Sequence, residues 1–209
     1  MPRVSQAHLD ARRRQILDAA RRCFVRNGFH ATSMQDVLAE AGLSAGAVYR
    51  YFRSKDEIIV AIAGEAVTEI AGAIDSALGA DDPPPLDEVL GAAFQAIQRI
   101  DAEQGIARLA LQVWGEAVRN PALAETLTDE IRRVRGSLAR LVQVYQARGL
   151  MPDDQPAEQV SRVLAGLLPG FVFQHALLGD VDAATFRAGL RTLLATRLGS
   201  EVGPAATTS

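Results

Sequence analysis

Cysteine and histidine are scarce in this sequence of 209 residues. It holds one cysteine, Cys23, so no disulfide can form within the chain, and such usage is typical of a protein from a reducing cytosol. Its three histidines, His8, His30 and His175, lie far apart along the chain. A cluster of histidine and cysteine ligands is not expected, and we predict neither a metal nor a cofactor.

The motifs of common enzyme classes are also missing. The sequence contains no H-E-x-x-H, G-x-S-x-G, Walker or Rossmann glycine pattern. Cys23 lies beside the apolar stripe of a predicted helix, which favours a packed core residue over a reactive thiol. These observations argue against an enzyme.

Long apolar runs are absent as well. No stretch of 18 apolar residues occurs, and the N-terminus has no apolar core of signal-peptide length. The richest apolar stretch, residues 163–178, is interrupted by Gly166, Pro169, Gly170, Gln174 and His175. We therefore predict a cytoplasmic protein with no membrane partner.

What the sequence does have is helical periodicity. Alanine and leucine dominate the long segments, and apolar residues recur at helical spacing along nine of them, the first covering residues 9–27. The pattern predicts an all-α fold of about nine helices, after a flexible arm at residues 1–8. Pro169 predicts a kink or an end in the eighth helix. The expected helix starts are Ser33, Ser44, Ser54, Asp87, Asn120, Asp154 together with Pro156, and Asp182.

Two short helices joined by a tight turn are predicted for residues 33–55. Ser33 is a favourable N-cap, with Asp36 three residues later in the place of a capping-box residue. Gly42 suits the left-handed end of the first helix, and Ser44 caps the second. This is the helix-turn-helix pattern, whose second helix enters the DNA major groove.

Charge is distributed unevenly between the two parts of the chain. Residues 1–56 hold ten Lys and Arg against five Asp and Glu, a net charge of +5, whereas the whole chain carries -3. The remainder therefore carries -8. A basic N-terminal part on an acidic remainder suits a protein that binds a polyanion, although a chance fluctuation of surface charge gives the same count.

The second helix of the motif offers groups for both phosphates and bases. Arg50 is its one long donor, which suits bidentate contact with a guanine edge, and its small N-terminal residues allow close approach to the groove. Tyr49 and Tyr51 lie two residues apart, so one of them is expected to pack partly in the core. The candidate phosphate contacts are Thr32, Ser33, Ser44, Tyr49, Tyr51 and Lys55, and the candidate base-reading residues are Ala45, Gly46, Ala47 and Arg50.

A family resemblance rests on residues 28–58, which read G-F-H-A-T-S-M-Q-D-V-L-A-E-A-G-L-S-A-G-A-V-Y-R-Y-F-R-S-K-D-E-I. This stretch resembles the N-terminal signature of the TetR family of bacterial transcriptional regulators, and the match covers about residues 16–62. The resemblance implies a three-helix DNA-binding head, a linking fourth helix and a larger ligand-binding body. In the family, positions 45 and 47 often carry longer polar residues. Here both are alanine, so base reading is expected to depend on Arg50 and on DNA shape.

The resemblance also implies domains and a homodimer. We predict the head at residues 1–56, a ligand-binding and dimerisation body at residues 57–199, and a disordered tail at residues 200–209. The dimer is expected to form through the eighth and ninth helices, which carry more apolar surface than one buried face needs, unless these side chains pack only within their own chain. They are Leu164, Leu167, Leu168, Phe171, Val172, Phe186, Leu190, Leu193 and Leu194.

A small-molecule effector, apolar or amphipathic, is expected in a pocket inside the body. Gln174 and His175 interrupt an apolar run and are the expected polar contacts, although His175 equally suits the dimer interface. The aromatic candidates are also candidates for simple core packing. The predicted pocket residues are Phe94, Trp114, Tyr145, Phe171, Gln174 and His175, with Phe173 beside them.

The predicted function is that of a repressor released from a palindromic DNA operator when the effector binds. The alternative is a DNA-binding or nucleoid-type protein that responds to no ligand, which the alanines at positions 45 and 47 keep open.

Overall fold

The computed structural model describes residues 6–79 and 82–195, which form nine α-helices and one short 3-10 helix and contain no strand, as predicted. The predicted tail at residues 200–209 lies outside the described residues. The helices are α1 (Gln6–Asn27), α2 (Met34–Ala41), α3 (Ala45–Tyr49), α4 (Lys55–Asp75), α5 (Leu86–Gln104), α6 (Ala107–Ala117), α7 (Pro121–Ala147), α8 (Ala157–Leu178) and α9 (Ala183–Ala195), with the 3-10 helix η1 at Ser76–Gly79.

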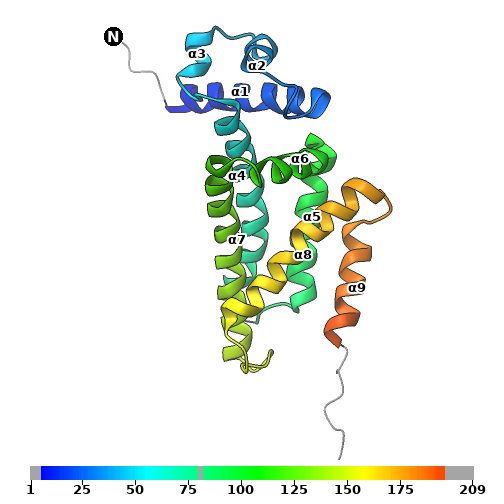
Figure 1. Cartoon of the computed structure of the whole chain (residues 1–209). Helices are drawn as coiled ribbons and strands as arrows, with labels where there is room; N and C mark the ends of the chain where they lie inside the picture. The colour runs from blue at the N-terminus through cyan, green and yellow to red at the C-terminus, as the bar shows by residue number, and fades with distance from the viewer. Residues whose placement is uncertain (1–5, 80–81, 196–209) are drawn as a thin grey trace, which may run out of the picture.

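Helices α1, α2 and α3 form a head at one end of the molecule, and α4 leads from it into the body of α5 to α9 (Figure 1). The amphipathic pattern of α1 buries one stripe against α2, and α3 adds Val48 to the same core. Residues 6–8 belong to α1, so the predicted flexible arm is wrong for these three residues. The core of the head includes Ile16, Leu17, Phe24, Phe29, Val37, Val48 and Phe52.

Helix α4 belongs to both packing units. Its first turns place Ile58, Ile59 and Ile62 in the core of the head, whereas Ile74 near its end is fully buried in the core of the body. It runs beside α7 and α5 in the body, as Figure 1 shows. A rotation of α4 must therefore move the head and disturb the body together. The predicted domain boundary after residue 56 stays a prediction.

The body is a helical bundle around one apolar core. Helix α7 packs between α4 and α8, and α9 packs against α5 (Figure 1). Helix α6 lies between the head and the bundle and contacts α7, α8 and α1. The largest fully buried side chains of this core are Phe94, Phe171, Ile74, Leu90, Leu138 and Leu141.

Most of the predicted helix starts are confirmed, and two are wrong. Ser33, Ser44, Ser54 and Asn120 are N-caps, and the carboxylate of Asp182 accepts the Thr185 N–H at 2.7 Å. By contrast, α5 begins at Leu86 after Pro85, and Asp87 lies inside its first turn. That carboxylate is buried and accepts from Arg187 Nε of α9 at 2.9 Å, so it joins two helices instead of capping one.

Two further predictions concern α8, namely where it begins and whether it ends at Pro169. Helix α8 begins at Ala157 with Pro156 as its N-cap residue, so the predicted start is confirmed at Pro156 and wrong at Asp154. The same helix continues through Pro169 to Leu178, which excludes an end at the proline.

Candidate nucleic-acid interface and ligand cavity

Local capping fixes both ends of α2. The Ser33 hydroxyl accepts the Asp36 N–H at 3.3 Å, and the Asp36 carboxylate accepts the Ser33 N–H at 2.8 Å, which completes a capping box. Hydrogen bonds to this carboxylate from the Ser33 hydroxyl and from the Ser33 N–H hold the pKa of Asp36 below its ordinary value. Gly42 ends α2 with φ of 63°, a left-handed conformation that glycine adopts without strain.

Helix α3 is short and presents most of its surface to solvent. Val48 points into the core, whereas Ser44, Ala45, Gly46 and Tyr49 are exposed and Ala47 is half-buried. The helix lies at the free end of the head, away from the body (Figure 1). This is the position that a recognition helix needs in order to enter a groove.

Arg50 follows α3 as its C-cap residue, so the prediction that it lies within the helix is wrong by one position. Its side chain is exposed, and no ion pair of Arg50 occurs among residues 6–79 and 82–195. The guanidinium is therefore available to a ligand outside the chain.

Two predicted phosphate contacts are used inside the head instead. The Thr32 hydroxyl is buried and lies 2.8 Å from the carbonyl oxygen of Gly28 and 3.2 Å from that of Cys23. Lys55 Nζ donates to the carbonyl oxygens of Phe29, His30 and Thr32 at 2.9, 3.3 and 3.2 Å. An ammonium has three donors, so these carbonyls occupy all of them. The geometry therefore opposes a phosphate role for either side chain.

Ser33 and Tyr51 also make contacts within the head, which leave them less available to a phosphate. The Ser33 hydroxyl donates to the Asp36 carboxylate at 2.7 Å, which places a negative charge beside it. Tyr51 is half-buried and packs against the head core, while Tyr49 is 46% exposed. The expectation that one of the two tyrosines packs partly in the core is confirmed, and Tyr49 is the freer donor.

Ion pairs reduce the positive charge that the head offers. Arg22 and Arg26 of α1 both bind Glu40 of α2, at 2.7 and 3.1 Å, and these hydrogen bonds lower the pKa of that carboxyl. Arg13 and Arg21 both bind Glu65 of α4. Four of the ten basic residues in positions 1–56 thus pair with carboxylates, and the charge count alone overstates the basic surface.

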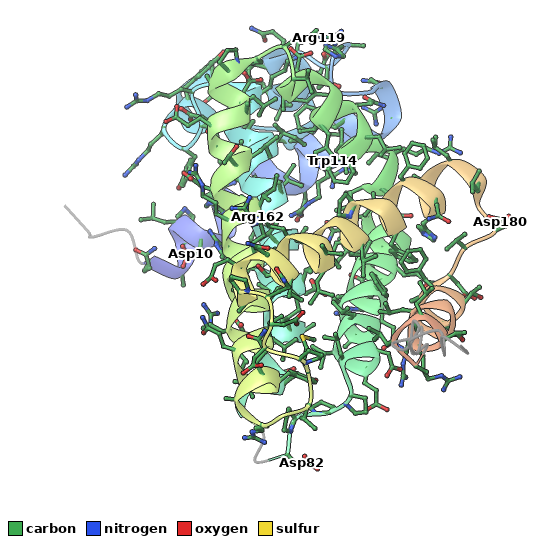
Figure 2. The ribbon with its side chains drawn as sticks, turned by 60° about the horizontal axis from the view of Figure 1, so that its bottom comes forward. Asp10, Asp82, Trp114, Arg119, Arg162 and Asp180 are labelled. Carbon is green, nitrogen blue, oxygen red and sulfur yellow. The ribbon has the colours of Figure 1, made fainter. Side chains whose placement is uncertain are left out.

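An apolar cavity of about 290 Å³ lies in the body among α4, α5, α6, α7 and α8. Trp114 of α6 lines it, and Figure 2 shows Trp114 toward the centre of the body, with Arg119 at the edge. Glu130 is the one carboxylate in the wall. The other lining residues are Ala63, Val67, Ile70, Ile97, Leu127, Ile131, Val134, Ala165, Leu168, Pro169 and Val172.

Of the six predicted pocket residues, only Trp114 lines this cavity. Phe94 and Phe171 are fully buried with ring centroids 5.2 Å apart, so they are core residues. The Tyr145 hydroxyl donates to the carbonyl oxygen of Pro84 and fixes the loop before α5. Burial raises the pKa of Tyr145.

The two polar candidates lie in other places. Gln174 lines an apolar groove between α8 and α9, beside Leu167 and Leu193. His175 stacks on Phe171 and is held at both ring nitrogens, with Nδ1 2.8 Å from the carbonyl oxygen of Val181 and Nε2 3.2 Å from Asp101 Oδ2. Phe173 is 52% exposed on α8. These three positions are not contacts of the cavity.

Helix α6 contacts the head directly, which the sequence did not reveal. The Gln112 side-chain oxygen accepts the Phe29 N–H at 2.9 Å, and Glu116 lies 3.3 Å from His30 Nε2. Both residues contact the loop between α1 and α2, and Trp114 lies between them in the sequence. Their spacing of four residues on one helix was the only signal available, and it is common on exposed helix faces.

Comparison with known families agrees with this arrangement. Residues 16–62 match the model of the bacterial regulatory proteins of the tetR family, and residues 86–199 match the C-terminal model of BetI-type transcriptional repressors. The chain belongs to the TetR family. It is a DNA-binding transcriptional regulator and not an enzyme.

Several curated HTH-type transcriptional regulators match most of the chain. The HTH-type transcriptional repressor Rv1474c of Mycobacterium tuberculosis is 32% identical over 174 residues, which cover 80% of this chain and 86% of the relative. The HTH-type transcriptional repressor AcnR of Corynebacterium diphtheriae is 26% identical over 182 residues, which cover 87% of this chain and 90% of the relative. Regulators of the TetR family bind operator DNA and generally dimerise.

Solved structures show the same fold. Salmonella enterica GusR superposes with a TM-score of 0.75 at 29% identity, over 92% of this chain and 97% of that one. The fatty acid degradation regulator FadR from Bacillus halodurans superposes with a TM-score of 0.74 at 19% identity, over 90% of this chain and 97% of that one.

Among the described helices of this TetR-family chain, α8 is long and apolar enough to span a membrane. One such helix is weak evidence of a membrane span, because the core helices of soluble proteins can have the same length and composition.

Proposed function

We propose that this regulator is a cytoplasmic repressor that leaves a palindromic operator when a small molecule enters the cavity lined by Trp114. The observation that carries the proposal is the double role of α6. Trp114 contributes to the cavity wall, while Gln112 and Glu116 contact the head two residues to either side. Two residues on a helix span about 3 Å along its axis, so a ligand that shifts Trp114 also shifts both head contacts.

The proposed DNA surface is α3 with the residues that flank it. Arg50 reads a base edge, and Tyr49 and Ser44 donate to phosphates, because these three side chains are exposed at the free end of the head. Ala45, Gly46 and Ala47 let the backbone of α3 approach the groove, and Ser33 and Tyr51 are secondary phosphate contacts. Thr32 and Lys55 position the loop before α2 instead of touching DNA.

The proposed homodimer forms through α8 and α9. One side of α8 exposes Val163, Phe173 and Leu177 at 70%, 52% and 56%, and Leu193 of α9 is 72% exposed. A patch of this kind on a regulator whose relatives generally dimerise is a candidate interface. Gly166 and Gly170 lie on the same side and face open space, since a Cβ at either position meets nothing within 4 Å. Because they have no side chains, they keep this side of α8 flat.

Operator binding and release test this function directly. The chain should bind the DNA upstream of its own gene or a neighbouring gene as a dimer, and a ligand of the cavity should weaken that binding at least about tenfold. Gln112→Ala should leave ligand binding intact and reduce the ligand effect, because it removes one of the two α6 contacts with the head. Operator affinity that never changes with any cavity ligand would favour the ligand-independent alternative.

A further inference from the structure

Two acceptors in the cavity wall lack a partner that they would ordinarily have. The first is Glu130 of α7, whose side chain is 14% exposed. Its Oε1 accepts from Arg133 at 3.2 Å, whereas Oε2 is buried and has no hydrogen-bond donor among the described residues. The carboxylate can present either oxygen to the cavity, because rotation about its last bond is broad and roughly two-fold.

The second acceptor is a backbone carbonyl. Helix α8 continues through Pro169, and the proline nitrogen carries no hydrogen, so the carbonyl of Ala165 cannot receive the usual bond from residue 169. Ala165 and Pro169 both line the cavity. The proline thus leaves a carbonyl without its helical donor at the same wall to which α7 contributes Glu130.

We propose that the ligand of this cavity is an organic cation that carries N–H groups on an apolar body, such as a primary or secondary ammonium. The proposal rests on the proposed function of the cavity as the effector site. The N–H groups bind Glu130 and the Ala165 carbonyl, and the body packs on the apolar walls beside Trp114. Leaving the buried Oε2 of Glu130 unpaired is costly, more so because the group is charged, so a ligand that supplies an N–H donor to it is favoured.

Other ligand classes fit the same residues less well. An anion is repelled by Glu130, and a hydrocarbon leaves Glu130 Oε2 unpaired and supplies no donor in place of the missing Pro169 N–H. A quaternary ammonium brings charge but no N–H donor. Arg133 pairs with Oε1 of Glu130 from an open groove on the other side and also donates to Thr68 Oγ1 at 3.1 Å, so it leaves Oε2 for the ligand. The volume of about 290 Å³ suits a small molecule.

Trp114 provides the readout, because it is the only tryptophan in the sequence. The full-length protein is titrated with 4-phenylbutylamine, neutral 4-phenylbutanol and the trimethylated quaternary ammonium of the same skeleton, while Trp114 fluorescence is followed. The amine should bind at least about tenfold more tightly than either of the other two. Equal affinities for the three probes, or no binding of the amine, would overturn the proposal.

Variants test whether Glu130 and the Ala165 carbonyl cause the preference for the amine. Glu130→Gln should reduce the preference for the amine over the alcohol to less than about threefold, whereas Glu130→Asp, which keeps the charge, should retain part of it. Glu125→Gln is the matched control, since this exposed residue of α7 lies outside the cavity wall. Pro169→Ala restores an N–H for the Ala165 carbonyl and should weaken amine binding by about two- to tenfold. An amine preference that is unchanged in Glu130→Gln would contradict the assignment.

Operator release separates this inference from the proposed function. If the amine binds with the predicted pattern and operator affinity stays constant, the ligand class stands and the effector function fails. If a molecule of another class binds the cavity and releases the operator while the amine does not bind, the effector function stands and the ligand class is wrong.

Discussion

The head and the body differ in how close along the chain their functional groups lie. In the head, the exposed groups of α3 come from consecutive residues, and hydrogen bonds three or four positions long hold them in place. In the body, the cavity gathers residues from five helices. A local site is therefore specified by a motif, whereas a site made by packing depends on how whole helices are arranged.

The largest expected effect comes from disrupting the proposed dimer surface on α8. Phe173→Glu places a charge on the exposed side of α8 and should give a monomer at micromolar concentration. Because a monomer loses the gain from binding two half-sites, operator affinity should fall by about 100-fold or more. Sedimentation and operator titration measure both quantities.

The matched control for this prediction is Leu150→Glu, which changes an equally exposed apolar residue between α7 and α8. It should remain dimeric with unchanged operator affinity. A dimeric Phe173→Glu protein would show that the two heads are spaced by another surface.

The next largest effect tests the head as the reader of sequence. Arg50→Ala should reduce discrimination between the operator and unrelated DNA by about 1–3 kcal/mol, because one bidentate base contact is lost. Competition titrations with both DNAs measure the ratio of affinities. Arg132→Ala, an exposed arginine of α7, serves as the control. An equal loss of affinity for both DNAs would reassign Arg50 to phosphate binding.

A smaller effect separates the internal role of Lys55 from a phosphate contact. Lys55→Ala removes a donor from three backbone carbonyls and a cation 4.6 Å above the Phe29 ring. The free energy of unfolding should fall by about 1–3 kcal/mol. The salt dependence of operator binding should keep its slope. A stable variant whose slope falls by about one unit would restore the phosphate role.

The smallest effect concerns the Glu40 ion pairs and depends on pH. The folded protein lowers the pKa of Glu40 below its ordinary value of 4.5, so the ionised carboxylate contributes stability that is present above this pH. Protonation removes that contribution as the pH falls through the lowered value. Glu40→Gln should therefore have a lower melting temperature than the wild type at pH 7. The difference should shrink below pH 4.5, and a difference that is constant with pH would contradict this account.

The sequence predicted the local features of the fold and missed those that depend on distant partners. The capping box of Ser33 and the left-handed Gly42 follow from residues at most a few positions apart, and both are confirmed. Lys55 looked like a phosphate donor because its acceptors lie 23 to 26 positions earlier in the chain. Asp87 looked like a cap because Arg187, its partner, follows 100 positions later.

The cavity shows the same limit more strongly. The sequence predicts aromatic residues of the body as pocket residues, yet Phe94 and Phe171 pack on each other in the core. The residues that do line the space are mostly aliphatic and have the same helical spacing as core residues. Only the arrangement of the helices distinguishes a wall residue from a core residue, and periodicity does not contain that information.

The burial of Cys23 makes the chain well suited to site-selective labelling. Its thiol is buried, close to the carbonyl oxygen of Asp36, and burial raises the pKa, so little of the reactive thiolate forms. A cysteine introduced at exposed Ala11 of α1 then becomes the accessible thiol of each protomer. Two spin labels attached there would measure the separation of the heads in a dimer, with and without a cavity ligand, while the native cysteine stays in place.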